Sequence, residues 1–264
     1  MLTADEKLAA IGVKIERAKK HFDNLKIARQ RFVDAEPKPY SFSANDNPET
    51  GEVELQIIQL TEPPDEIGLI TGDVVHNLRS ALDHLAYQLV FIGTNGNGPF
   101  KNAYFPISNS AAKYETSKIG KVKGMTQDAK EAIDSIQPYR RGVGHLLWVI
   151  HELDIADKHH ALIVSDLRVK EATLSRSGQS FNGSLTYGQL VSFGKFNLSE
   201  SRKPLKAGDV FFTFNRNDYD DVKPTFDITF SKPEIVPGQS VLVTLEYAIQ
   251  TINDAILSFR DLLV

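Results

Sequence analysis

The stretch DEIGLITGDVVHNLRSALDHLAYQLVFI, residues 65–92, decides the fold of this chain. It follows two consecutive prolines, and its apolar residues recur every three or four positions, which is the period of an α-helix. At about 100° per residue, one side of that helix collects a set of aliphatic side chains: Ile67, Val74, Leu78, Leu82, Leu85 and Leu89. The sequence therefore predicts a long helix over about 65–92 with one face in a core.

The opposite face of this predicted helix has an uncommon polar composition. Between Ile67 and Phe100 the chain has no lysine and no glutamate, the residues that a solvated helix face ordinarily recruits. The polar and aromatic positions are His76, Asn77, Arg79, Ser80, Asp83, His84 and Tyr87. Such a set indicates a partly enclosed, hydrogen-bonded face. It is either a site that binds or transforms a ligand, or a structural network between packed helices.

Further helices are predicted on both sides of this stretch. The capping-box pattern Thr-Ala-Asp-Glu begins an amphipathic helix over about 3–35. A short helix over 126–137 is stopped by a proline, and a longer helix follows over about 143–159. A heptad-like apolar stripe predicts a C-terminal helix over about 240–263. The two long helices at the ends are expected to pack in one bundle, or to face a second subunit in a homodimer.

Strand patterns occupy two other parts of the chain. Alternating apolar residues on either side of the turn Asn-Asp-Asn-Pro-Glu-Thr-Gly predict a β-hairpin, and short apolar runs separated by Gly, Asn and Asp predict later strands. The sequence therefore predicts an α+β protein, a bundle of four or five helices with an appended, mainly antiparallel β-sheet. A single domain is expected over 1–264, with its bundle core in 3–35, 65–92, 126–159 and 240–263 and its β segments in 39–61 and 161–232.

Two carboxylates on the helix predicted over 143–159 lie where apolar residues are expected. The helical wheel places Asp154 and Asp157 on the apolar stripe, and unpaired carboxylates are costly to bury. The candidate partners are cationic side chains of the 65–92 helix: Arg79, His76 and His84. Two basic residues follow at the negative C-terminal end of the helix: Lys158 and His159. The carboxylates then either fix helix register through a buried Arg79–Asp157 pair or orient the histidines of a site.

Composition excludes several kinds of chemistry. The chain has no cysteine, which removes disulfides, thiolate zinc sites and cysteine nucleophiles, and which suits a reducing cytoplasm. Its acidic, charged N-terminus does not resemble a secretory signal, and no apolar run approaches the roughly 20 residues of a membrane span. We therefore expect a cytoplasmic protein with no membrane partner.

The charge balance supports nucleic-acid binding locally and not globally. The formal net charge is −4 and the isoelectric point about 6.0. Residues 113–141 nevertheless contain seven Lys or Arg against four Asp or Glu. The stretch KIGKVKG, residues 118–124, is expected to be a mobile loop that contacts RNA phosphates, or simply a lysine-rich solvated loop. The lysines concerned are Lys118, Lys121 and Lys123.

The spacing Arg79-Ser-Ala-Leu-Asp-His84 resembles the Arg-x(4–6)-His signature of HEPN proteins, all-α bundles that include ribonucleases of bacterial conflict and toxin systems. The resemblance implies RNA cleavage without a metal ion, in the cleft of a homodimer. Arg79 would hold the scissile phosphate and His84 would act as general acid or base, with His76 and Asp83 beside them. The family pattern has Asn, Asp or His after the arginine, where this chain has Ser80.

A longer likeness involves two helices. HNLRSALDHL at 76–85, together with DKH at 157–159, resembles uncharacterised bacterial proteins and implies no established activity.

The leading functional prediction is therefore a HEPN-like, metal-independent ribonuclease, related to toxins or defence, with no metal and no cofactor. A non-catalytic binding or interaction module is the alternative, in which the His/Arg/Asp network only specifies packing. A metal-dependent hydrolase is a third, with candidate ligands His76, His84, Asp83, His151, Asp154 and Asp157. The motifs Glu-x-x-His and His-Glu-x-x-His are absent, and no Gly-x-Ser-x-Gly elbow surrounds Ser80.

Overall fold

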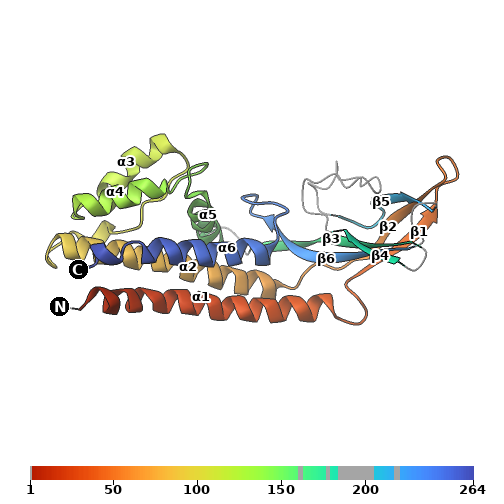
Figure 1. Cartoon of the computed structure of the whole chain (residues 1–264), viewed down its shortest axis with the longest axis horizontal. Coiled ribbons are helices and arrows are strands. Elements are labelled where there is room, and N and C mark those ends of the chain that lie inside the picture. Colours follow the sequence, from red (N-terminus) through yellow and green to blue (C-terminus); the bar gives the residue numbers. More distant parts are fainter. Residues whose placement is uncertain (1, 160–162, 177–178, 184–204, 217–220) are drawn as a thin grey trace. The chain divides into compact units, whose positions relative to one another are not determined.

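The protein has an α+β fold. The computed structural model describes residues 2–159, 163–176, 179–183, 205–216 and 221–264, and the backbone of this part forms six α-helices and six β-strands (Figure 1). The chain divides into two compact units, each assembled from separate segments. A helical unit comprises Met1–Lys26, Gly68–Ile163 and Leu242–Val264, and a sheet unit comprises Ile27–Ile67 and Val164–Val241.

The five predicted helices form, although the last of them ends at Leu257 and not at 263, and a further helix over 111–121 was not predicted. The helices are α1 (Ala4–Val33), α2 (Asp65–Gly93), α3 (Ala111–Lys121), α4 (Gln127–Ile136), α5 (His145–His159) and α6 (Val241–Leu257), with 3₁₀ turns at Phe100–Asn102 and Arg260–Leu262. The capping box of α1 is present, because the Glu6 amide donates to Thr3 Oγ1 at 3.2 Å and the Thr3 amide to Glu6 Oε2 at 2.7 Å. In the described residues, no helix is long and apolar enough to cross a membrane.

The core of the helical unit follows the predicted apolar stripes. The six aliphatic residues assigned to the buried face of α2 are each at most 1 % exposed. The C-terminal stripe is also buried, from Leu245 to Leu263. The two ends of the chain meet, since Lys7 Nζ donates a buried hydrogen bond to the carbonyl of Leu263 at 2.8 Å. Helices α1 and α6 therefore belong to one core although they are far apart in sequence.

One helix corrects the sequence prediction. The expected mobile loop over 118–124 is wrong, because its first four residues complete α3. Ser110 is the N-cap of this helix, where its side chain accepts from the Lys113 amide. At the other end of this region, α5 starts at His145 and not at 143, because the chain around Gly142 and Gly144 packs against the turn at Gln137.

The sheet unit contains two antiparallel sheets of three strands each within the described residues. One has the order β1 (Tyr40–Asp46), β2 (Glu52–Leu60), β5 (Val210–Asn215), and the other has the order β4 (Gln179–Gly183), β3 (Val164–Arg176), β6 (Asp221–Lys232). The predicted hairpin over 39–61 is confirmed as β1–β2. Of the β segment predicted over 161–232, residues 161–162, 177–178, 184–204 and 217–220 lie outside the described residues.

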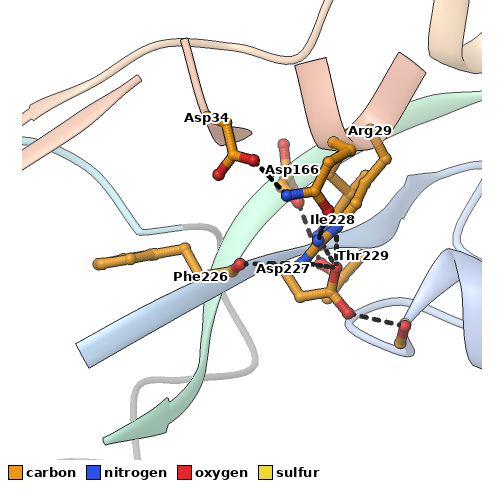
Figure 2. Close-up of polar contacts among 9 residues, drawn as sticks. Arg29, Asp34, Asp166, Phe226, Asp227, Ile228 and Thr229 are labelled. Carbon is orange, nitrogen blue, oxygen red and sulfur yellow. Dashed lines mark hydrogen bonds and ion pairs between the residues drawn. The ribbon is translucent and has the colours of Figure 1, made fainter. Parts of the chain in front are cut away.

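A buried ion pair joins the end of α1 to β6 in the sheet unit (Figure 2). Arg29 contacts Asp227 Oδ1 through NH2 at 3.0 Å and Nε at 3.1 Å. The same carboxylate accepts from the Ile228 amide at 2.9 Å and from Ser240 Oγ at 3.0 Å. Both oxygens of Asp227 are therefore bonded, which is what a buried carboxylate requires.

The end of α2 depends on a close backbone approach at Gly93. A Cβ added there would lie 2.2 Å from the Gly124 carbonyl oxygen and 2.9 Å from the Thr126 amide nitrogen. These neighbours are backbone atoms, which cannot relieve a clash by changing rotamer. Gly93→Ala is therefore expected to lower the free energy of unfolding by about 1–3 kcal/mol, measured by urea denaturation. Gly120→Ala in α3 is the matched control, because nothing lies within 4 Å of its Cβ position. It should leave stability unchanged or raise it; equal losses in both variants would contradict the argument.

Candidate functional site

Between its two ends, α2 exposes side chains along one narrow stripe. Positions at three- and four-residue spacing remain open along it: Leu69, Asp73, His76, His84 and Tyr87 are exposed, and Ser80 is half-buried. Two other positions of the predicted polar face, Arg79 and Asn77, are buried. Arg79 is only 5 % exposed, and Asn77 is buried with its amide donating to the Asp73 carbonyl at 2.8 Å. The predicted polar face is thus split into an open stripe and a buried cluster.

A histidine–carboxylate pair links the open stripe to α5. His76 Nδ1 lies 3.1 Å from Asp154 Oδ1, and Lys158 Nζ donates to Asp154 Oδ2 at 2.7 Å. Asp154 is 4 % exposed, whereas the His76 side chain is 47 % exposed. The expectation that Asp154 is buried against partners from α2 is confirmed. A carboxylate on Nδ1 favours the tautomer whose free lone pair is on Nε2, so the accessible nitrogen of His76 is able to accept a proton.

Ser80 lies one helical turn after His76. Its Oγ is 3.5 Å from His76 Nε2, which is long for a hydrogen bond between an oxygen and a ring nitrogen. No turn of free backbone amides accompanies this serine, because it lies in the middle of α2 where the amides are engaged in the helix. Ser80 is therefore a neighbour of the imidazole and lacks the surroundings of an acyl-transfer nucleophile.

Arg79 is held in a second, buried cluster. Its NH2 lies 2.8 Å from Asp83 Oδ1 and donates to the Phe105 carbonyl at 3.1 Å, and the Phe105 amide donates to Asp83 Oδ1 at 3.0 Å. Burial lowers the pKa of the Arg79 guanidinium, and burial raises the pKa of the Asp83 carboxyl more than Arg79 lowers it. Burial is thus the largest influence on the pKa of each partner, and a buried ion pair is not by itself a sign of added stability.

The two residues of the HEPN resemblance lie in different surroundings. Arg79 is buried in its pair with Asp83, whereas His84 is exposed, and no hydrogen bond or ion pair joins them within the described part of the chain. The buried Arg79–Asp157 bridge expected from the sequence is wrong, since Arg79 pairs with Asp83.

Asp157 is half-buried against the backbone of α2. A Cβ at Gly72 would lie 2.6 Å from both of its carboxylate oxygens. Burial, followed by the charges of Asp154 and Asp73, raises the pKa of Asp157. The glycine was the sequence signal for this contact, because only a residue without a side chain leaves room for the carboxylate.

The lysines predicted to contact RNA from a loop are distributed otherwise. Lys118 is on α3 and bonded to Asp134 and to Glu115 at 2.9 Å. Lys121, the last residue of α3, is half-buried, while Lys123 is exposed beyond the helix.

Two other predicted site residues lie at helix ends. Tyr87, at the end of the open stripe of α2, is exposed, and its ring centroid lies 4.9 Å from that of Phe100. His159, the last residue of α5, is also exposed.

The charge of Arg79 also acts on His151, which the sequence predicted only as a candidate metal ligand. The Nδ1 of His151 and the NH1 of Arg79 are buried, and neither has a hydrogen-bond partner among the residues that the structure describes. Burial, followed by the charges of Arg79, Lys121 and Lys158, lowers the pKa of His151 to about 3, so this imidazole is neutral. Burial and the charge of Arg79 also lower the pKa of Lys121. The spacing of His151 from Asp154, one turn of α5, was the available signal.

The described residues were also compared with the needs of a metal site. Among these residues no three His, Asp or Glu side chains are placed to share one ion. The chain matches no known family model, no curated protein and no solved structure, so its function has to be inferred from the geometry of the candidate site.

Proposed function

We propose that the protein cleaves RNA without a metal ion and that His76 is the general base. The observation that carries the proposal is the pair formed by a half-exposed imidazole and a buried carboxylate, His76 Nδ1 to Asp154 Oδ1 at 3.1 Å. This arrangement fixes the ring and leaves Nε2 open to a substrate hydroxyl. The proposal moves the proton-accepting role from His84, which the HEPN resemblance assigns, to a histidine with an orienting partner.

In the proposed reaction His76 Nε2 takes the proton of a ribose 2′-hydroxyl. The oxygen then attacks the adjacent phosphorus, and the bond from phosphorus to the 5′ oxygen breaks. Water gives a proton to the leaving oxygen, and the hydroxide that remains takes back the proton held by His76. The products are a 2′,3′-cyclic phosphate and a 5′-hydroxyl. Lys158, half-exposed, bonds the other oxygen of Asp154 at 2.7 Å, and in the proposed reaction it supplies a positive charge for the phosphate.

The test is the cleavage of an end-labelled single-stranded RNA in EDTA. His76→Ala is expected to reduce the rate by about 10²–10⁴-fold, the usual contribution of a general base. Asp154→Asn should also reduce it, because an amide no longer fixes the tautomer. His145→Ala is the control, since it removes an exposed imidazole from the same unit outside the site. Circular dichroism establishes that each variant is folded.

His84→Ala separates the two assignments of the base. Loss of cleavage in this variant while His76→Ala stays active would overturn the role of His76. If the wild-type protein cleaves RNA no faster than the His76→Ala preparation, the proposed ribonuclease activity is wrong.

A non-catalytic module is the second candidate, and the Arg79–Asp83–Phe105 cluster favours it. That cluster ties the chain after α2 back to the helix through two hydrogen bonds of the Phe105 backbone, and the Arg79–Asp83 pair joins their partners within α2, which is what a packing network does. In this case the His76→Ala and Asp154→Asn variants would change only stability.

A further inference from the structure

Three aromatic rings lie together where α2 ends. The ring centroid of Tyr87 lies 4.9 Å from that of Phe100 and 6.5 Å from that of Phe91, and the Phe91 and Phe100 centroids are 6.3 Å apart. The ring planes are inclined to one another by 25°, 28° and 32°. The rings therefore form a near-parallel set, to which a further flat ring can be added by offset stacking.

Tyr87 is the most exposed ring of this set. It is 41 % exposed, whereas Phe91 and Phe100 are half-buried. The loop after α2 lies against the two phenylalanines through glycines, since a Cβ at Gly96 or at Gly98 would be 3.3 Å from atoms of the Phe91 or the Phe100 ring. The phenylalanines are thus held by the loop, and the tyrosine presents the accessible part of the set.

The chain around these rings carries positive charge and lacks carboxylates. Residues 84–114 contain no Asp and no Glu, and Lys101, which directly follows the loop phenylalanine, is exposed. Lys123 is also exposed, and its neighbour Gly124 packs against the same loop, with its Cβ position 3.3 Å from Pro99. An accessible aromatic ring bordered by lysines is complementary to a chain of flat bases and phosphates.

Tyr87 lies on the same side of α2 as the proposed base. It follows His76 by eleven residues, which correspond to about 16 Å along a helix and about 20° around its axis. Ser80 and His84 occupy the open stripe between them. A single strand with one phosphate at His76 can therefore place a base at Tyr87 a few nucleotides away.

We infer that Tyr87, backed by Phe91 and Phe100, is a platform on which an unpaired RNA base stacks. The inference rests on the proposed RNA cleavage and names its substrate class, single-stranded RNA. Every base has a π face, so the platform selects unpaired bases and not a sequence, while Lys101 and Lys123 supply positive charge for the adjacent phosphates. In a duplex the base faces are already stacked on one another, so a paired base cannot use the platform.

Three variants isolate the aromatic ring. Tyr87→Leu removes the ring and keeps an apolar side chain of high helix propensity, so the fold is retained. Tyr87→Phe keeps the ring and should restore the wild-type behaviour. Tyr247→Leu is the matched control, because Tyr247 is a 67 % exposed tyrosine on α6 of the same unit. Circular dichroism establishes that each variant is folded.

Binding of a fluorescein-labelled single-stranded RNA is measured by fluorescence anisotropy, with each variant made in the His76→Ala chain so that the RNA stays intact. We expect Tyr87→Leu to weaken binding by about 5- to 150-fold, the usual contribution of one base stacked on an aromatic side chain. Tyr87→Phe and Tyr247→Leu should change the affinity by less than about twofold. An abasic nucleotide moved along the strand should cost the same affinity at one position, and only when the ring is present.

Cleavage by chains that retain His76 separates the platform from the proposed reaction. A dinucleoside monophosphate is too short to reach Tyr87, so the wild type and Tyr87→Leu should cleave it equally, whereas a longer RNA should show a raised KM in Tyr87→Leu. Base-dependent binding that is lost in Tyr87→Leu, in a protein that cleaves nothing, would overturn the ribonuclease and keep the platform. Equal binding of single strand and duplex, or equal losses in Tyr87→Leu and Tyr247→Leu, would overturn the platform.

Discussion

Asp83→Ala is expected to lower the free energy of unfolding by about 3–5 kcal/mol, because it leaves the Arg79 guanidinium buried without its carboxylate. The same change removes the acceptor of the Phe105 amide, a second buried group. Chemical denaturation followed by far-ultraviolet circular dichroism measures the loss. Asp5→Ala is the control in the same unit, since the Asp5–Arg260 pair is exposed and should contribute little.

The double variant Arg79→Met/Asp83→Leu tests whether the unpaired charge of Arg79 causes the loss of stability in Asp83→Ala. Burial dominates the pKa shifts of both partners, so removing the two charges together avoids both desolvation costs. We expect it to be more stable than Asp83→Ala but to remain below the wild type, because the Phe105 amide and carbonyl lose their partners. A double variant as unstable as the single one would show that the Phe105 bonds, and not the unpaired charge, account for the loss.

Asp227→Ala is expected to have an effect of similar size in the sheet unit, again about 3–5 kcal/mol. The carboxylate bonds Arg29 twice, Ser240 Oγ and the Ile228 amide, so one substitution removes an acceptor that donors on three residues share (Figure 2). Thermal and chemical denaturation of the full chain measure the loss, and they also establish whether the two units unfold together.

The matched control for Asp227 is an exposed ion pair of the same unit. Arg216 Nε lies 2.9 Å from Asp46 Oδ1, a distance as short as those at Asp227, but both side chains are more than half exposed. Asp46→Ala should therefore change stability little, because water replaces the lost contact. If Asp46→Ala and Asp227→Ala proved equally costly, burial would not be the property that matters.

Periodicity predicted most of the helices because it reports directly on which side of a helix is buried. The aliphatic stripe of α2 and the carboxylate Asp154 on the stripe of α5 were both placed correctly by the helical wheel. The same wheel misplaced Arg79, which it left on the flank of the polar face. That flank is covered by the chain around Phe105, which follows a loop, and no local pattern shows where such a segment returns.

The partners of the buried cluster were missed for a related reason. A wheel describes one helix, whereas Lys121 and His151, on whose pKa values the charge of Arg79 acts, belong to two others. The charge run 118–124 suggested a mobile loop because its lysines and glycines are common in solvated segments. Ser110 was the available signal of a helix there, since serine is a favoured N-cap residue. Its side chain accepts a hydrogen bond from the Lys113 amide, three residues on.

The order of segments in the helical unit bears on how the protein is made. This unit needs Met1–Lys26, Gly68–Ile163 and Leu242–Val264, and the bond from Lys7 Nζ to the Leu263 carbonyl joins its first and last segments. While the chain grows from the ribosome, the apolar faces of α1 and α2 that pack in this unit stay partly exposed until α6 has been synthesised. A nascent chain that stops before Leu242 should therefore engage chaperones and be degraded, and the delay is a direct result of this segment order.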